Sequence, residues 1–298
     1  MWPRSYAELL RRAQERLSSI EHTSIDSRFG TIEYAERGEG HPVLLLHGIF
    51  GGFDAACLTA DRWIGDGFHV VAPSRFGCLG SSLPPNATVA DQADAYAVLL
   101  DALGIGRAAV VGFSAGTVSA MQFGLRHPDR ITALVLMSGH YPQKHHKLPE
   151  FPLRLLYTDR VFWMLKTFAP ELFARVCGTP KGFRASPGEQ WALRSVMEGL
   201  FPITPRRQGA IFDTLVSEPD VDSFPLEQIS VPTLLIHAAD DALARYATVP
   251  PAAARIPGAR LLTIQRGGHL YLGAEARVRR EVAGFIRAHI PQEARPGR

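Results

Sequence analysis

The chain is poor in cysteine and carries no strong excess of charge of either sign. Its 298 residues include three cysteines, Cys57, Cys78 and Cys177, which lie far apart without Cys-x-x-Cys spacing. An odd number of widely spaced cysteines argues against a disulfide framework and predicts a reducing compartment, with the cytoplasm as the default location. The formal net charge is +3, and the basic residues are scattered along the chain. We therefore expect no nucleic-acid partner, because nucleic-acid binders concentrate basic residues on one face.

Long hydrophobic runs and nucleotide-binding motifs are missing as well. No stretch approaches the ~18 apolar residues that a membrane span requires, so we expect no membrane span. Neither Gly-x-Gly-x-x-Gly nor a Gly-Lys-Ser/Thr ending occurs, which argues against a bound nucleotide. His140, His145 and His146 lie close together but lack a companion carboxylate pattern. That cluster favours a solvated loop over a metal site.

What the chain does contain is an alternation of short apolar runs with helical patterns, typical of an α/β domain with a mostly parallel sheet. Several runs are continuously apolar, as expected of strands that are covered on both faces. The predicted strands are 31–36, 43–46, 69–72, 108–112, 131–137, 233–237 and 260–264. The predicted helices are 54–66, 91–103, 115–127 and 274–289, with a short amphipathic helix near the N-terminus.

One interval, residues 140–229, breaks the alternation. It contains no clear strand but many prolines and large apolar residues, and Pro170 divides its densest part into two helical pieces. We interpret it as a helical cap inserted between two strands of the sheet. The predicted organisation is an N-terminal helical arm (1–25), a core (26–139 and 230–298) and the cap (140–229).

A Gly-x-Ser-x-Gly motif at residues 112–116 directly follows the apolar run 108–111. Between a buried strand and a helix, this motif predicts a sharp turn that exposes the Ser114 hydroxyl above the sheet. A serine hydroxyl is a poor nucleophile at neutral pH, so a histidine must accept its proton during attack. A carboxylate must in turn orient that histidine and stabilise the imidazolium that forms. The motif therefore indicates a catalytic serine only if a suitable histidine and a suitable carboxylate follow later in the chain.

Both partners are found after later strands, in the order serine, acid, histidine. Asp240 and Asp241 follow the predicted strand 233–237, and His269 follows the strand 260–264 behind two glycines. Each position lies past the carboxyl end of a parallel strand, where open α/β sheets place their sites. We expect Asp241 to be the acid, with Asp240 as the fallback, and His269 to be the base. His237 ends a strand and is interpreted as a core or rim residue.

Attack on a carbonyl also needs hydrogen-bond donors for the developing oxyanion, each worth ~3 kcal/mol. The backbone N–H of Ala115, at the start of a helix, is one candidate. The glycine-rich loop after strand 43–46 supplies the other, most plausibly the N–H of Ile49. The expected site thus consists of Ser114, Asp241 and His269 with the amides of Ile49 and Ala115, and no metal ligands.

Taken in order, His47-Gly48, the segment 72–82, the turn around Ser114, Asp241 and Gly268-His269 resemble the α/β-hydrolase superfamily, specifically its capped, serine-dependent, esterase- or lipase-like members. The resemblance covers roughly residues 25–139 and 230–290. It implies an eight-stranded, mostly parallel sheet, a cap after the sixth strand, and a Ser-Asp-His triad that works without a cofactor.

Individual residues then restrict which of that family's reactions this chain is expected to catalyse. Relatives that open epoxides or remove halides use an aspartate nucleophile, and Ser114 argues strongly against both reactions. We expect a carboxylic ester hydrolase that forms an acyl-enzyme on Ser114, and the apolar cap favours small to medium lipophilic esters. The alternatives are a lactonase, a carbon–carbon bond hydrolase, a haloperoxidase- or perhydrolase-like enzyme, or a slow or non-catalytic ligand-binding protein on the same fold.

Overall fold

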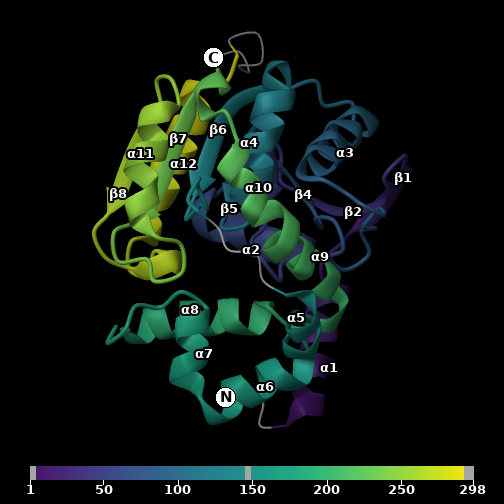
Figure 1. The fold of residues 1–298 in the computed structure, drawn as a ribbon, viewed down its shortest axis with the longest axis vertical. Helices are drawn as coiled ribbons and strands as arrows, with labels where there is room; N and C mark the ends of the chain where they lie inside the picture. Colours follow the sequence, from purple (N-terminus) through teal and green to yellow (C-terminus); the bar gives the residue numbers. More distant parts are fainter. Residues whose placement is uncertain (1–4, 145–148, 292–298) are drawn as a thin grey trace.

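The computed structural model describes residues 5–144 and 149–291, which build an open eight-stranded sheet with helices on both faces (Figure 1). The strands lie in the order β1-β2-β4-β3-β5-β6-β7-β8. The pairs β1–β2 and β2–β4 are antiparallel, and every other pair is parallel. The strands are β1 (Thr23–Ser27), β2 (Gly30–Arg37), β3 (His41–Leu46), β4 (Phe68–Pro73), β5 (Ala108–Phe113), β6 (Ile131–Met137), β7 (Thr233–Ala238) and β8 (Arg260–Ile264).

The α-helices fall into three groups. Those around the sheet are α2 (Phe53–Trp63), α3 (Val89–Ala102), α4 (Gly116–Arg126), α11 (Val249–Arg255) and α12 (Glu275–Ala288). Those between β6 and β7 are α5 (Glu150–Leu156), α6 (Asp159–Phe168), α7 (Pro170–Val176), α8 (Pro187–Gly199), α9 (Arg207–Phe212) and α10 (Glu218–Asp220), with a π-helical turn at Asp213–Ser217. The third group is α1 (Tyr6–Ser18) alone. None of the helices in the described ranges has the length and apolarity to cross a bilayer.

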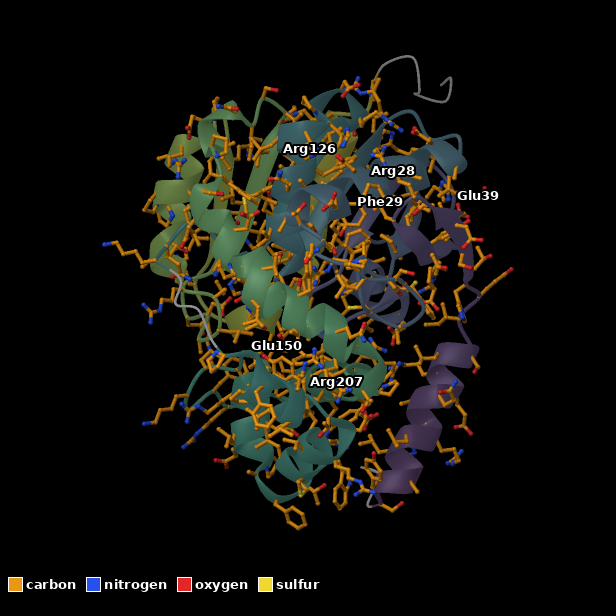
Figure 2. All side chains as sticks on the ribbon, turned by 45° about the vertical axis from the view of Figure 1, so that its right-hand side comes forward. Arg28, Phe29, Glu39, Arg126, Glu150 and Arg207 are labelled. Atoms are coloured by element: carbon orange, nitrogen blue, oxygen red, sulfur yellow. The ribbon has the colours of Figure 1, made fainter. Side chains whose placement is uncertain are left out.

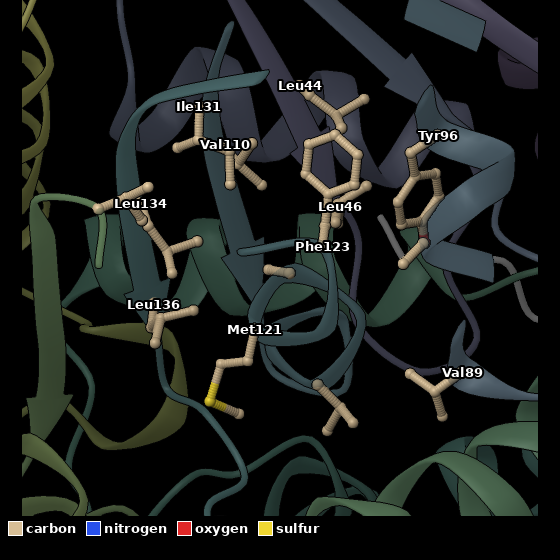
Figure 3. Close-up of a cluster of buried hydrophobic side chains, with 14 of the residues drawn as sticks. Leu44, Leu46, Val89, Tyr96, Val110, Met121, Phe123, Ile131, Leu134 and Leu136 are labelled. Atoms are coloured by element: carbon tan, nitrogen blue, oxygen red, sulfur yellow. The ribbon is translucent and has the colours of Figure 1, made fainter. Parts of the chain in front are cut away.

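Alternation of side chains along the strands divides the core into two layers. Leu44, Leu46 and Val110 point to the face covered by α3 and α4, whereas Val43 and Leu45 point to the face covered by α2 and α12. Figure 3 shows the first layer, with strand side chains packed against the side chains of α3 and α4. Both layers are almost inaccessible to water, which explains the continuously apolar strand sequences.

The predicted strands are all present, with bounds within two residues of those expected. The sheet also has the eight strands that the resemblance implied, because it begins one strand earlier than the apolar runs indicated. That strand, β1, is antiparallel at the sheet edge, and its side chains are exposed or half-buried. Pro170 separates α6 from α7 as expected.

Of the helices between β6 and β7, α5 to α8 gather at one end of the molecule with α1 beside them, whereas α9 and α10 run back alongside the body that holds the sheet (Figures 1 and 2). Leu9 and Ala13 of α1 are buried in one cluster with Phe162, Phe173 and Phe201. We call the residues from Glu150 to Asp220 the cap helices. Their position over the sheet's carboxyl edge places them above the residues that the sequence singled out.

Candidate active site

Ser114 lies in the sharp turn between β5 and α4. Its φ of 52° is in the left-handed region, which costs a non-glycine residue on the order of 1–3 kcal/mol and is typical of functional turns. Gly116 makes the turn possible, because a Cβ there would lie 2.3 Å from the Leu46 carbonyl oxygen. Thr117 secures the turn by donating both its N–H and its hydroxyl to the Ser114 carbonyl.

The structure brings Ser114, His269 and Asp241 into one hydrogen-bonded line. His269 Nε2 is 2.9 Å from Ser114 Oγ, and His269 Nδ1 is 2.8 Å from Asp241 Oδ2. In the arrangement that suits both partners, Nδ1–H donates to the carboxylate and Nε2 accepts from the hydroxyl. The side chains of Asp241 and His269 are 0% and 4% exposed, so water competes little for these bonds.

Asp241 accepts three hydrogen bonds, one from His269 and two from backbone N–H groups, and a second imidazole lies close to it. Its Oδ1 accepts the backbone N–H groups of Leu243 and Ala244, at 2.8 and 2.9 Å. His237 Nε2 lies 3.0 Å from the Ala244 carbonyl oxygen and 3.3 Å from Asp241 Oδ2, so its N–H is shared between the two. Burial alone would raise the pKa of Asp241, but the adjacent His269 and the hydrogen bond from His237 outweigh it and hold that pKa well below the ordinary range. The carboxylate therefore stays ionised across the physiological range.

Asp240 takes a different position from Asp241. Its two oxygens accept the N–H groups of Gly267 and Gly268, at 3.2 and 2.9 Å. It thereby fixes the double-glycine turn that carries His269, without touching the imidazole. His237, interpreted from sequence as a core or rim residue, is indeed buried, but its contact with Asp241 went unforeseen.

His47 and Gly48 organise the loop that follows β3. His47 is fully buried, its Nε2 accepts the N–H of Arg75 at 2.9 Å, and its Nδ1 therefore donates to the Gly48 carbonyl at 2.7 Å. Burial, aided by the charge of Arg75, lowers the pKa of His47 well below its usual value and keeps the ring neutral. The carbonyl of Gly48 and the N–H of Ile49 belong to one planar trans peptide and point in opposite directions. Holding the carbonyl thus also sets the direction of the Ile49 N–H.

The same loop passes close to Ser114 and is tied down from the cap. A Cβ on Gly48 would lie 3.0 Å from Ser114 Cβ. Arg206, from the cap region, donates to the Phe50 carbonyl at 3.2 Å and to both oxygens of Asp54. Ala115 precedes the first residue of α4, so its N–H is among those that have no carbonyl partner inside the helix. The two predicted oxyanion donors thus flank the serine on rigidly held segments.

A second buried ion pair joins the cap to the core. Arg75, after β4, makes two parallel hydrogen bonds to the carboxylate of Asp213 in the π-helical turn, and both side chains are 1% exposed. Neither this pair nor Arg206–Asp54 was foreseen from the sequence. The only signal in the sequence was a charged residue within a mostly apolar segment. Such a residue does not reveal which oppositely charged residue, more than a hundred positions away, will be its partner.

An apolar cavity of about 260 Å³ opens directly over Ser114 and His269. Its floor comes from the loop after β3 and from β5, and its roof comes from the cap helices. The residues that line the cavity are Gly48, Ile49, Phe50, Phe113, Ser114, Tyr157, Phe162, Val176, Cys177, Val196, Leu200, Leu243, His269 and Leu270. None of these residues is a lysine, an arginine or a carboxylate, so the cavity fits an uncharged, lipophilic compound.

The histidine cluster noted in the sequence gathers no metal site among the described residues. His140 is half-buried, with Nε2 3.8 Å from Glu218 Oε1, rather than solvated as we predicted, while His145 and His146 lie outside the described residues. Across residues 5–144 and 149–291, no three metal-ligating side chains come together.

Comparison with known proteins agrees with this geometry. The sequence model of the α/β-hydrolase fold family matches residues 41–273. An uncharacterized hydrolase, YcgS, of Bacillus subtilis is 27% identical over 263 residues, which cover 83% of this chain and 91% of that protein. The 2-hydroxymuconate semialdehyde hydrolase of Pseudomonas putida is 28% identical over 78% of this chain and 82% of its own.

A putative carbamate hydrolase, RutD, of Caulobacter vibrioides is 28% identical and covers 77% of this chain and 84% of its own. Among solved structures, an α/β-hydrolase fold protein from Nakamurella multipartita superposes with a TM-score of 0.75 at 26% identity, covering 90% of this chain and 99% of its own. Because the family model spans well over half of the sequence, the chain belongs to the α/β-hydrolase fold family.

Proposed function

We propose that this protein is a serine hydrolase that cleaves carboxylic esters of small to medium lipophilic compounds through an acyl-enzyme on Ser114. The observation that carries the proposal is the unbroken line from Asp241 through His269 to Ser114, which ends in an apolar cavity. A hydrogen-bonded nucleophile and base, with the base oriented by a third group, is the arrangement that activates a serine.

The reaction follows from the contacts. His269 Nε2 accepts the Ser114 proton as Oγ attacks the ester carbon, and the ionised Asp241 stabilises the imidazolium that forms. The negative charge that develops on the carbonyl oxygen is taken up by the N–H groups of Ile49 and Ala115. The imidazolium then gives its proton to the departing alkoxide, and a water molecule, activated in the same way, releases the acid from Ser114.

The cavity favours an uncharged substrate over an anionic one. A substrate with a carboxylate would lack a cationic partner there, because no lysine or arginine is among the described residues that line it. A carbon–carbon bond hydrolase acting on an anionic compound fits the site less well for that reason.

The test is turnover of p-nitrophenyl esters of graded acyl length by wild type, Ser114→Ala and Ser119→Ala. Ser119 lies on α4 one turn further along, outside the cavity, and serves as the matched serine control. We expect ester turnover in wild type and Ser119→Ala and its loss in Ser114→Ala. A fluorophosphonate should label Ser114, which mass spectrometry of the digested protein would detect. Tight binding of a small apolar ligand without turnover of any ester would instead favour a binding protein.

A further inference from the structure

The backbone of His269 is held from two sides. On the core side, the Ser138 hydroxyl donates to the His269 carbonyl at 2.8 Å. On the other side, the N–H of His269 donates to the carbonyl of Gly178 at 3.1 Å. Gly178 lies in the loop that joins α7 to α8 (residues 177–186), which we call the cap loop. The residue that supplies the proposed base is therefore hydrogen-bonded to the cap as well as to the core.

The cap loop and the turn that carries His269 approach each other so closely that both need glycine at the point of contact. A Cβ on Gly178 would lie 2.2 Å from His269 Cβ. A Cβ on Gly268 would lie 2.6 Å from both the Gly178 carbonyl oxygen and Pro180 Cδ. Neither contact leaves room for a methyl group, so the backbone of one side would have to move if either glycine gained a side chain.

The position of Gly178 at the end of α7 explains only part of this contact. Its φ is 85°, and its N–H donates to the Arg175 carbonyl at 2.9 Å. A glycine in the left-handed region commonly ends an α-helix in this way. That role accounts for the φ. It does not require the Gly178 carbonyl to accept from His269, nor the missing side chain to leave room for that residue.

Helix α8 packs against the residues that follow the base. Leu270 and Leu272 form one buried cluster with Ala192 of α8, and Phe183 of the cap loop packs against this cluster. The guanidinium of Arg266 lies over the Phe183 ring, with 4.9 Å between Cζ and the ring centroid. The cap therefore contacts the chain both before and after the base.

The core holds other atoms of the same turn. Asp240 accepts the N–H groups of Gly267 and Gly268, and Asp241 accepts from the imidazole of His269. If the cap loop moved away, these bonds could remain, but the N–H of His269 would lose its acceptor and its Cβ would lose its closest neighbour across the contact.

We propose that the cap loop positions the catalytic base, so that the triad is complete only while this loop packs against the turn that carries His269. Gly178 is then a positioning residue, which acts through His269 and does not line the cavity. Val176 and Cys177, which do line the cavity, directly precede it. Movement of this part of the cap would thus open the cavity and disable the base together. The proposal rests on the proposed function above, since it concerns the base of the same reaction.

The test compares Gly178→Ala with Gly182→Ala. Gly182 lies in the same loop with a φ of 74°, and a Cβ on it would meet no atom within 4 Å, so its variant has comparable backbone strain without the contact. Relieving the 2.2 Å approach to His269 Cβ needs a displacement of about 1 Å, which should lower kcat about 10²-fold in Gly178→Ala. Gly182→Ala should retain the wild-type kcat.

Two readouts separate positioning of the base from a change in the shape of the cavity. p-Nitrophenyl acetate and p-nitrophenyl octanoate should lose kcat by the same factor, because the base serves both, whereas an altered cavity wall would change their ratio. The downfield ¹H NMR signal of the proton between His269 Nδ1 and Asp241 should shift or broaden in Gly178→Ala and stay unchanged in Gly182→Ala. Thermal unfolding, measured in parallel, identifies any general loss of structure.

Ala192→Leu is a second perturbation, for the case in which Gly178→Ala folds poorly. It adds volume between α8 and the leucines that follow His269, and overpacking shifts the backbone. Its kcat should fall by about tenfold or more, again by the same factor for both esters.

The outcomes separate this role from ester hydrolysis itself. A kcat within about tenfold of Gly182→Ala in both test variants, or a loss that depends on acyl length, would overturn the positioning role while leaving the proposed function intact. Failure of the wild type to cleave any ester would overturn the proposed function. The NMR signal would then decide the positioning role, and an unchanged signal in Gly178→Ala would overturn it.

Discussion

Replacing Asp241 by asparagine should remove nearly all activity while leaving the fold in place. The carboxylate faces two pairs of donors: the backbone N–H groups of Leu243 and Ala244 on Oδ1, and the two imidazoles, His269 and His237, on Oδ2. An asparagine has one acceptor oxygen and one NH₂ group. Its oxygen can accept from one pair of donors, while its NH₂ group then faces the other pair, donor against donor.

The magnitude follows from which pair the amide oxygen keeps. If it keeps the two backbone N–H groups, the NH₂ group faces His269 Nδ1 and forces the tautomer with the proton on Nε2. That tautomer cannot accept the Ser114 proton, and kcat should fall about 10⁴-fold. If the amide flips, the backbone N–H groups of Leu243 and Ala244 lose their side-chain acceptor, which costs on the order of 1 kcal/mol each. The first arrangement should therefore prevail.

Asp240→Asn is the matched comparison, because Asp240 is adjacent and also accepts two N–H groups, those of Gly267 and Gly268. Weakening one of these bonds costs on the order of 1 kcal/mol, so a fall in kcat of about tenfold or less is expected. The assay is steady-state turnover of a p-nitrophenyl ester, with circular dichroism and thermal unfolding as folding controls. An equal or greater loss in Asp240→Asn would refute the assignment of Asp241.

Two further outcomes are expected. His47→Ala should lower kcat about 10²-fold or more with little change in KM, measured by steady-state kinetics, because the peptide that presents the Ile49 N–H loses its anchor. Burial and the neighbouring Asp213 raise the pKa of Glu218 to about 7. Its ionised form therefore costs stability that grows as the pH rises from about 4.5 to 7, so Glu218→Gln should gain up to about 3 kcal/mol over wild type at pH 8 and nothing at pH 4.5 in denaturant unfolding.

The parts of the fold that could be predicted from sequence are those with a local physical signal. Strands β3 and β6 are buried on both faces and therefore continuously apolar, and their bounds were found within two residues. Strand β1 carries no such signal, since Thr23–Ser27 lies at the sheet edge with polar, partly exposed side chains. The positions of Ser114 and His269 were predictable because each follows a recognisable strand across a glycine-containing turn.

Features that depend on distant parts of the chain could not be predicted. The contacts of His237 and the burial of Arg75 and Arg206 depend on partners brought together by the fold. The cap residues that roof the cavity depend on which face each helix turns toward the sheet, and that is set by packing between helices with similar apolar content. The sequence could not decide between Asp240 and Asp241, because the turn after β7 directs the two adjacent carboxylates to different partners: Asp240 to the Gly268 N–H and Asp241 to the His269 imidazole.

The attachment of α1 through Arg16 has a consequence for the order in which this chain is made. The guanidinium of Arg16 donates to the carbonyls of Glu198, Gly199 and Phe201, which lie 182 to 185 residues further along. A 13-residue helix is only marginally stable in isolation. Because α1 lies early in this chain, it emerges from the ribosome before most of the residues that pack against its apolar face. Leu9 and Ala13 share their buried cluster with Phe50 and with residues between Phe162 and Ala210, most of which are synthesised long after α1. The end of the molecule that α1 covers is therefore completed late in folding, although α1 lies early in this sequence.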